Sequence, residues 1–159
     1  MPLLGAHMSI SGGLEKALFR GKTCGCQVIQ LFTRNPNQWV CGELSSKEID
    51  AFHTARVQTS VVPVAAHDSY LINLASPRPE NRRRSLQALQ DELVRTDLLG
   101  IPYVVIHPGA HMGSGEKIGI RRIAGSLNRI FERTSKLRVR ILLETTAGQG
   151  TGLGYRFEQ

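Results

Sequence analysis

Several features that would place the chain in a membrane or secreted class are missing from the sequence. No apolar run approaches the roughly 20 residues that cross a bilayer, and no basic segment precedes the first apolar run, as it would in a secretory signal. The cysteines number only three, Cys24, Cys26 and Cys41. Their odd number argues against a disulfide framework, and they lack the paired C-x-x-C spacing of a structural zinc site. We therefore expect a cytoplasmic protein with reduced thiols and no membrane association.

Acidic residues are also scarce. The chain has 13 Asp and Glu against 20 Lys and Arg, which gives a net charge of +7. Most of the basic residues are arginines, which bind phosphate oxygens in a forked geometry. This balance is compatible with a nucleic-acid partner. On charge alone, the simpler interpretation is a basic, soluble surface that has no dedicated partner.

The sequence alternates short apolar runs with segments of helical periodicity. Each run has the length and β-branched content of a strand that is buried on both faces. Alternation of this kind predicts βαβ units and a parallel sheet. The predicted strands are residues 3–6, 28–32, 61–66, 103–106 and 139–143.

Helix signals lie between these runs. Ser45 to Glu48 has the form of a capping box, with Ile49, Phe52 and Val57 following as the expected buried side. Pro79 is suited to open the next helix, which should stop near Gly100. A shorter helix is expected after Gly12 and Gly13, and a further apolar stripe is formed by Ile120, Ile123, Leu127, Ile130 and Phe131.

Two α/β architectures are compatible with this order. An open doubly wound sheet would carry a Gly-rich phosphate turn after the first strand, and none is present. The Gly-rich stretch 147–152 lacks the G-K-[ST] ending of a nucleotide-binding loop. A (β/α)₈ barrel, or TIM barrel, needs about 250 residues. We therefore expect residues 1–159 to form one α/β domain, an incomplete TIM barrel of about five βα units that lacks its carboxy-terminal part, as a fragment or a shortened reading frame would.

Metal-binding residue types end three of the predicted strands. His67 and His107 follow the third and fourth strands, 40 residues apart, and Glu144 follows the fifth strand 37 residues later. In a parallel barrel this spacing brings the three side chains to the carboxyl-end face, where such barrels keep their active sites. Two imidazoles and a carboxylate suit Zn²⁺ and leave coordination open for water or substrate. A single histidine at such a place is more often a hydrogen-bonded core residue.

His7 also ends a predicted strand, where it is suited to orient a ligand or a phosphate. His53 and His111 fall outside the pattern and are expected to face solvent. The run Arg82–Arg83–Arg84 is expected to be a solvated face near a helix start.

The loop after the second strand should lie at the same rim. It contains Arg34, Asn35, Asn37, Gln38 and Trp39. A cation, amides and an aromatic ring are typical of a surface that contacts phosphates and inserts between bases. The alternative is an ordinary turn whose Trp packs back onto the barrel. Tyr70 adds a second aromatic ring near His67.

Five segments of the sequence together resemble the endonuclease IV family, in register and over essentially the whole chain. They are Gly5–Ala6–His7–Met8–Ser9 with Gly12–Gly13, residues 31–35 through Gln38–Trp39, residues 67–74, His107–Pro108–Gly109 and residues 144–150.

The resemblance implies a (β/α)₈ barrel with a trinuclear zinc centre. Such enzymes hydrolyse the phosphodiester 5′ to abasic sites in double-stranded DNA during base excision repair, and they trim blocked 3′ ends. It implies that His67 and His107 bind the first zinc and that Glu144 bridges to the second and is catalytic. It implies DNA contacts at His7, Ser9, Arg34, Asn35, Asn37, Gln38, Trp39 and Tyr70. Family members often have Arg where this chain has Asn37, which departs from their insertion loop.

Two rival interpretations remain open at this point. One is a metal-dependent sugar isomerase or epimerase on the same barrel. The other is a truncated relative that binds DNA without turnover, because the remaining zinc ligands of the family have no counterparts in this sequence. We expect a monomer that binds at most one zinc tightly, is weakly active or inactive alone, and has poor solubility because strand edges are exposed.

Overall fold

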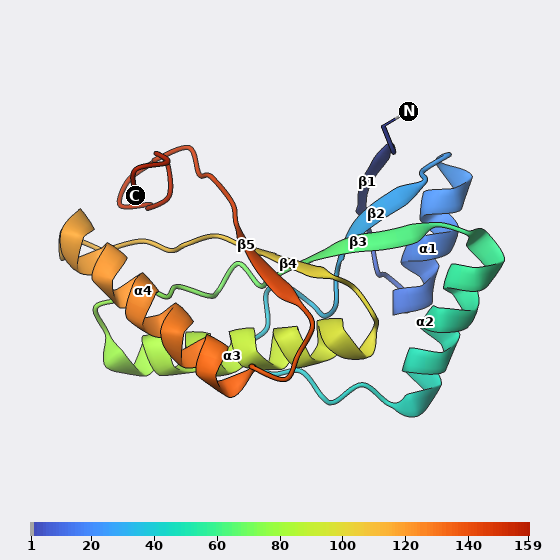
Figure 1. Ribbon diagram of the computed structural model, residues 1–159, viewed down its shortest axis with the longest axis horizontal. Helices are drawn as coiled ribbons and strands as arrows, with labels where there is room; N and C mark the ends of the chain where they lie inside the picture. The colour runs from blue at the N-terminus through green and yellow to red at the C-terminus, as the bar shows by residue number, and fades with distance from the viewer. Residues whose placement is uncertain (1) are drawn as a thin grey trace.

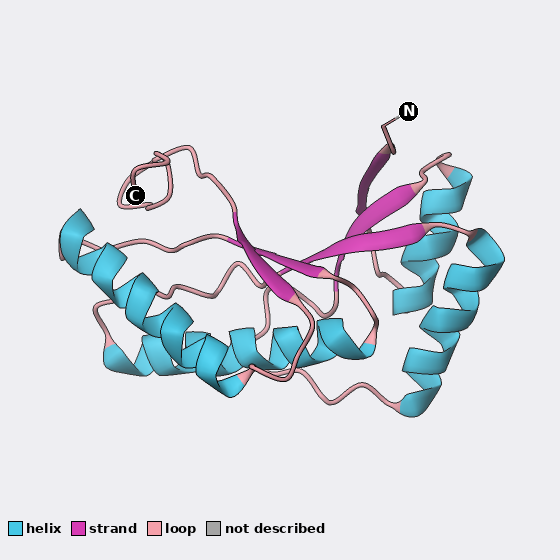
Figure 2. Cartoon of the chain, viewed as in Figure 1, coloured by secondary structure: helices cyan, strands magenta, loops and turns pink. Residues whose placement is uncertain are grey.

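The computed structural model describes residues 2–159 as an alternating series of strands and helices around one parallel sheet (Figures 1 and 2). The elements run in the order β1 (Gly5–Met8), α1 (Leu14–Thr23), β2 (Val28–Phe32), α2 (Ser46–Thr59), β3 (Val62–His67), α3 (Pro79–Leu98), β4 (Tyr103–Ile106), α4 (Glu116–Arg133) and β5 (Arg140–Leu143).

The sheet has five strands in the spatial order β1-β2-β3-β4-β5, and every neighbouring pair is parallel. Strands that neighbour in sequence also neighbour in space, as in a barrel, whereas a doubly wound sheet reverses its strand order. Within residues 2–159 the sheet is not closed, and β1 and β5 form its two edges. The predicted α/β fold, an incomplete TIM barrel, is confirmed.

The helices cover one face of the sheet. Figure 1 shows α1 and α2 beside the β1–β3 end, and α3 and α4 along the β4–β5 end. Alternate residues of the strands point into this layer, so Ile29 and Leu31 of β2 and Val104 and Ile106 of β4 are buried. The prediction that strands are buried on both faces is wrong for β2 and β4, because their intervening residues are only half-buried on the face without helices. It is also wrong for the edge strands β1 and β5, most of whose residues are exposed.

The start of the first strand was also predicted two residues too early. Leu3 and Leu4 are 61% and 70% exposed, and the ladder begins at Gly5, which pairs with Val28. The apolar character of Leu3 and Leu4 predicts a strand, but the ladder to β2 begins only at Gly5. Before it, the Leu4 carbonyl accepts from the backbone N–H of Gln27 at 2.8 Å, and Gln27 precedes β2. The shift places His7 inside β1.

Local signals set the helix boundaries. Ser45 caps α2 through its side chain, and Glu48 returns a bond to the Ser45 backbone, so the capping box is confirmed. Pro79 opens α3, and Gly100 follows its end with φ of 65°, a conformation that glycine adopts without strain. Two expected core residues are wrong, since Val57 is 81% and Phe131 is 53% exposed. Val57 lies five residues beyond the buried Phe52, a spacing that leads to a different side of a helix.

Candidate metal centre at the strand ends

Three neighbouring parallel strands carry a candidate ligand at or directly after their carboxyl-terminal ends. His67 is the last residue of β3, and His107 comes directly after β4. Glu144 comes directly after β5, and its backbone N–H donates to the Ile106 carbonyl at 2.9 Å. The ladder pairs His67 with Val105, two residues before His107. Because all strands run the same way, these three side chains emerge together at the carboxyl-end edge.

The three side chains meet in space. Glu144 Oε2 lies 3.0 Å from His67 Nε2 and 3.3 Å from His107 Nε2. One potential ligand atom from each residue lies within 4.8 Å of the other two. His67 is almost fully buried, while the side chains of His107 and Glu144 are each 45% exposed. The cluster therefore has a buried imidazole, that of His67, and is accessible to solvent at His107 and Glu144.

The hydrogen-bonding of His67 favours a cation within this cluster. Its Nδ1 lies 2.9 Å from the Asp68 carbonyl oxygen, which can only accept, so Nδ1 carries a proton. In the neutral ring Nε2 is then an acceptor that faces a carboxylate oxygen at 3.0 Å. Two acceptors at this distance require a proton or a metal ion between them. A histidine that donates through one nitrogen to a carbonyl and offers the other is the usual arrangement at zinc, so the donor set fits the metal.

The Asp68 carboxyl group is not part of this cluster and lies near the charges of Arg34 and Glu92. It is 2% exposed, and burial raises its pKa to about 8, with the charge of Glu92 adding to the shift and Arg34 opposing it. His7 lies beside His67, with their ring centroids 6.3 Å apart. Burial, and then the charge of His67, lower the pKa of His7, and its Nδ1 lies 3.2 Å from the Gln30 amide nitrogen. His7 thus lines the sheet beside the cluster, in contact with Gln30 rather than with Glu144.

The rim loop after β2, residues 33–39, holds its polar residues in two different ways. Asn35, Asn37 and Gln38 are exposed, as a surface that contacts a partner requires. Arg34 is only 4% exposed, and its Nε lies 3.0 Å from Glu92 Oε2. Its guanidinium also donates to the Ala88 carbonyl at 2.9 Å. Arg34 therefore fixes the loop to α3 from below and presents no free cation.

The aromatic residues of the rim divide in the same way. Trp39 is half-buried and packs against the core cluster beneath α3 and α4, as the alternative interpretation of the loop proposed. Tyr70 is 60% exposed, and its ring meets Phe32 edge-on at 5.5 Å and lies 5.9 Å from His67. Ser9 is exposed, and its carbonyl accepts from Arg20 at 2.8 Å. The histidines outside the pattern, His53 and His111, are half-buried rather than free in solvent.

Two residues that hold this edge together were not anticipated from the sequence. Glu92 lies fully buried under the rim loop and accepts from the Thr33 hydroxyl at 2.6 Å. Asn73 joins two loops through its side-chain amide. A signal for Glu92 was available, since a carboxylate sits between Leu89 and Leu93 on the apolar side of its helix. Asn73 lies in the segment 67–74 that carries the family resemblance, but nothing in the sequence indicates that its side chain joins two loops.

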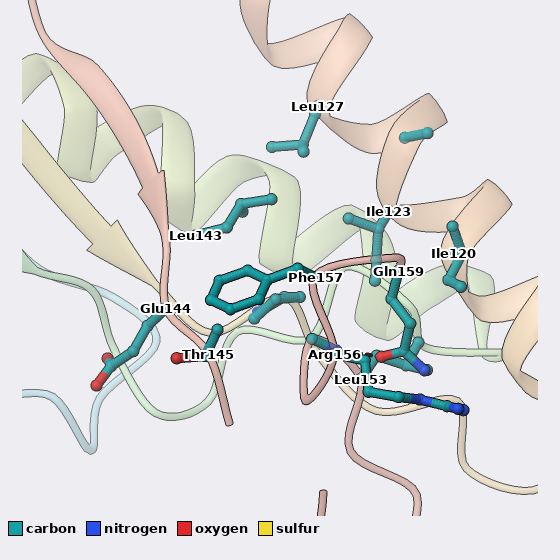
Figure 3. A pocket seen from close by; sticks show the side chains of 13 residues that line it. Ile120, Ile123, Leu127, Leu143, Glu144, Thr145, Leu153, Arg156, Phe157 and Gln159 are labelled. Atoms are coloured by element: carbon teal, nitrogen blue, oxygen red, sulfur yellow. Dashed lines mark hydrogen bonds between the residues drawn. The ribbon is translucent and has the colours of Figure 1, made fainter. Parts of the chain in front are cut away.

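An apolar pocket of about 290 Å³ adjoins the cluster and shares Glu144 with it, but neither His67 nor His107 lines the pocket. Figure 3 shows its walls, formed by Ile120, Ile123 and Leu127 of α4 on one side and by Leu143 and Phe157 on the other. In the same view the Glu144 carboxylate points away from the Phe157 ring. The pocket is therefore part of the packing around α4. The candidate metal-binding atoms lie outside it, on the side to which the Glu144 carboxylate points.

The fold and this cluster define an α/β-barrel protein with a candidate metal centre at the carboxyl ends of its strands. A profile of the xylose isomerase-like TIM barrel family matches residues 20–159, and the chain belongs to that family. Within the part of the chain that the structure describes, no helix is long and apolar enough to cross a membrane.

Relatives of known name sharpen the comparison. The chain is 51% identical over 158 residues to "Probable endonuclease 4" of Chloroflexus aurantiacus. The matched region covers 99% of this chain and 55% of that relative. It is 50% identical over 156 residues to the protein of the same name from Geobacter sulfurreducens, covering 98% of the chain and 53% of the relative. The chain thus spans about half the length of these relatives. The resemblance to endonuclease IV is confirmed.

Solved structures agree. Endonuclease IV from Thermus thermophilus superposes with a TM-score of 0.83 at 33% identity, over 99% of this chain and 56% of that one. A D-tagatose 3-epimerase-like protein superposes with a TM-score of 0.71 at 19% identity, which shows a shared fold alone.

Proposed function

We propose that this chain forms part of a zinc-dependent DNA-repair endonuclease that hydrolyses the phosphodiester 5′ to abasic sites and also trims 3′ ends. The observation that carries the proposal is the approach of His67, His107 and Glu144 to one another, at the edge of a barrel sheet whose relatives are named endonuclease 4. Such an enzyme would act on double-stranded DNA in the cytoplasm. We propose that it is a monomer.

In this proposal His67 and His107 would hold a zinc ion through their imidazole nitrogens, together with a carboxylate oxygen of Glu144. A bound zinc ion would acidify a water molecule and offset charge on phosphate oxygens. The protein's own contribution is to fix the ligands before substrate arrives. His67 is fixed by burial and by its bond to the Asp68 carbonyl. Glu144 is fixed where β5 pairs with β4.

The surrounding rim supplies the DNA contacts in this proposal. Asn35, Asn37 and Gln38 are exposed polar groups suited to phosphates and groove edges, and Tyr70 is an exposed ring suited to stack where a base is missing. The net charge of +7 favours approach to the duplex. An abasic position costs less to open than a paired one, which contributes to selectivity.

A metal titration tests the central assignment. Binding of Zn²⁺ or of Co²⁺, which has visible absorption, should be measured for the wild type and for His67→Ala and Glu144→Gln. We expect both variants to weaken binding by at least about tenfold. His53→Ala is the matched control, because His53 lies on α2 and its one side-chain hydrogen bond among described residues is with the Leu98 carbonyl. Equal affinity in all four proteins would contradict the metal site.

The substrate is tested separately, with fluorescent duplexes that differ only in one abasic position. The proposal requires tighter binding to the abasic duplex than to the intact one. Cleavage of that duplex is scored with and without a chelator, and we expect feeble cleavage or none, since the chain spans about half of its relatives. Equal affinity for the two duplexes would contradict the DNA assignment, and metal-dependent conversion of a ketose would favour a sugar epimerase.

A further inference from the structure

Asn73 bonds the loop after β3 to the loop after β4 through one side-chain amide. Its Oδ1 accepts from the backbone N–H of Ala110 at 3.0 Å, and its Nδ2 donates to the Ala110 carbonyl, also at 3.0 Å. Oδ1 accepts a further bond from the Ala75 N–H within its own loop, at 3.0 Å. The amide thus satisfies both backbone groups of Ala110, as a neighbouring strand would.

Ala110 in turn joins the loop after β5. It forms an isolated antiparallel bridge with Gly152, flanked by bonds from His111 N–H to the Thr151 carbonyl at 2.9 Å and from Leu153 N–H to the Gly109 carbonyl at 2.8 Å. The loops that follow His67, His107 and Glu144 are therefore connected in one continuous set of hydrogen bonds. Asn73 supplies the side-chain part of the connection between the first two.

Gly109 gives Asn73 the space for this contact. Its φ is 123°, a conformation that favours glycine, and a Cβ at this position would lie 2.5 Å from Asn73 Oδ1. A larger residue would push the amide away from Ala110. The backbone two residues beyond His107 is thus shaped around the Asn73 side chain.

His107 depends on this support more than His67 does. His67 is buried and bonded to the Asp68 carbonyl, whereas the His107 side chain is 45% exposed. Among described residues its only polar contact is with Glu144, at 3.3 Å. Its ring also packs edge-on against the His67 ring, with centroids 5.2 Å apart. With so few contacts of its own, the imidazole depends for its position on the backbone that carries it, and that backbone is held three residues later, at Ala110.

We propose that Asn73 is a positioning residue for the metal centre, fixing the His107 backbone so that Nε2 meets His67 and Glu144. The inference rests on the proposed function, since it concerns the same site. Asn73 touches neither metal nor substrate. It acts by removing the freedom of one ligand, so its loss lowers metal affinity and alters the coordination geometry without removing a ligand.

The test compares Co²⁺ affinity and the visible Co²⁺ spectrum at saturation. Asn73→Ala deletes the amide, and Asn73→Leu keeps the approximate volume of the side chain without its hydrogen-bonding groups. If one of these variants does not fold, the other still tests the inference. The control is Thr59→Ala at the end of α2, near the amino-terminal end of β3 and away from the cluster. There the buried Thr59 hydroxyl donates to the Ala55 carbonyl at 2.7 Å and accepts from Val61 N–H at 3.2 Å. Melting temperatures show how far each variant is destabilised.

We expect the Asn73 variants to bind Co²⁺ on the order of tenfold more weakly, with a changed spectrum at saturation. Thr59→Ala should lower the melting temperature comparably and leave affinity and spectrum unchanged. Wild-type affinity and spectrum in a folded Asn73 variant would overturn the inference while leaving the proposed function intact. An equal loss of affinity in Thr59→Ala would also overturn it, and absence of binding by the wild type would overturn the proposed function.

Discussion

Arg34 and Glu92 form a buried ion pair, with Arg34 Nε 3.0 Å from Glu92 Oε2 and side chains that are 3% and 1% exposed. The pair joins the rim loop after β2 to α3. Arg95 extends it by donating to the Thr33 hydroxyl and carbonyl at 3.2 Å and 2.6 Å. Burial raises the pKa of Glu92, while the bond from Thr33 and the two guanidinium groups oppose that shift. The loop is thereby held on a charged support beneath the surface.

Removing the Glu92 carboxylate should destabilise the protein strongly. Glu92→Leu leaves two buried guanidinium groups without their counter-charge, and we expect a loss of about 3–5 kcal/mol in the free energy of unfolding. Urea denaturation followed by circular dichroism measures it. The control is Asp91→Asn, an exposed neighbour that we expect to change stability by less than about 0.5 kcal/mol. Similar midpoints for both variants would show that the pair contributes little.

The sequence predicted the ends of β3, β4 and β5 well, and with them the cluster. Each strand is a short β-branched run bounded by a helix signal, and in a parallel sheet the residue that follows each strand lands at a known edge. His67, His107 and Glu144 could therefore be placed together from the sequence. The same logic failed at Leu3 and Leu4, because apolar character does not reveal where a pairing partner begins.

The direction of the rim side chains could not be predicted. Arg34 and Asn35 are neighbours in one polar loop, yet one is buried and the other exposed. The difference arises from Glu92, which lies in α3 and is distant in sequence. A loop's composition is the same whether its cation points outward or folds beneath, so long-range ion pairing decided the outcome. The role of Asn73 could not be predicted for the same reason, since its partner Ala110 belongs to another loop.

Tyr70 should contribute to DNA affinity through its exposed ring. Replacing it in Tyr70→Ala removes the stacking surface, and we expect binding to an abasic duplex to weaken by about 1–3 kcal/mol. Fluorescence anisotropy at fixed salt measures the change. Tyr70→Phe keeps the ring and serves as the control, so comparable losses in both variants would point to the hydroxyl instead. Unchanged binding by Tyr70→Ala would remove Tyr70 from the DNA surface.

The capping box of α2 offers a prediction independent of function. The Ser45 hydroxyl accepts from Glu48 N–H at 3.3 Å and donates to Glu48 Oε2 at 2.7 Å. Ser45→Ala should lower the free energy of unfolding by about 1 kcal/mol, because an N-terminal N–H loses its partner. Ser46→Ala is the control, being exposed one residue further into the helix. Equal free energies of unfolding for the two alanine variants would show that the Ser45 cap does not stabilise α2.

Glu116, the first residue of α4, holds the segment that follows β5. Its Oε1 accepts from the Tyr155 hydroxyl at 2.6 Å, and Arg156 lies 3.7 Å from Oε2. The Tyr155 ring packs against Gly148, where a Cβ would lie only 2.8 Å from it. Tyr155 therefore links Glu116 to the Gly-rich loop that follows Glu144.

This contact should make stability depend on pH in the acid range. The hydrogen bond from Tyr155 lowers the pKa of Glu116, with Arg156 adding to the shift and desolvation opposing it. A carboxyl group whose pKa is lowered on folding stabilises the native state fully above its unfolded pKa, near 4.5. That contribution is lost as pH falls through the lower folded value. The melting temperature of wild type should therefore exceed that of Glu116→Gln at neutral pH, and this difference should narrow below pH 4.5.

The control is Glu158→Gln, because Glu158 is exposed and has no such contact among described residues. Its melting temperature should show no comparable difference from wild type. A gap between wild type and Glu116→Gln that stays constant down to strongly acid pH would mean that the carboxylate charge does not hold the segment, and that the contact acts through packing of Tyr155 on Gly148.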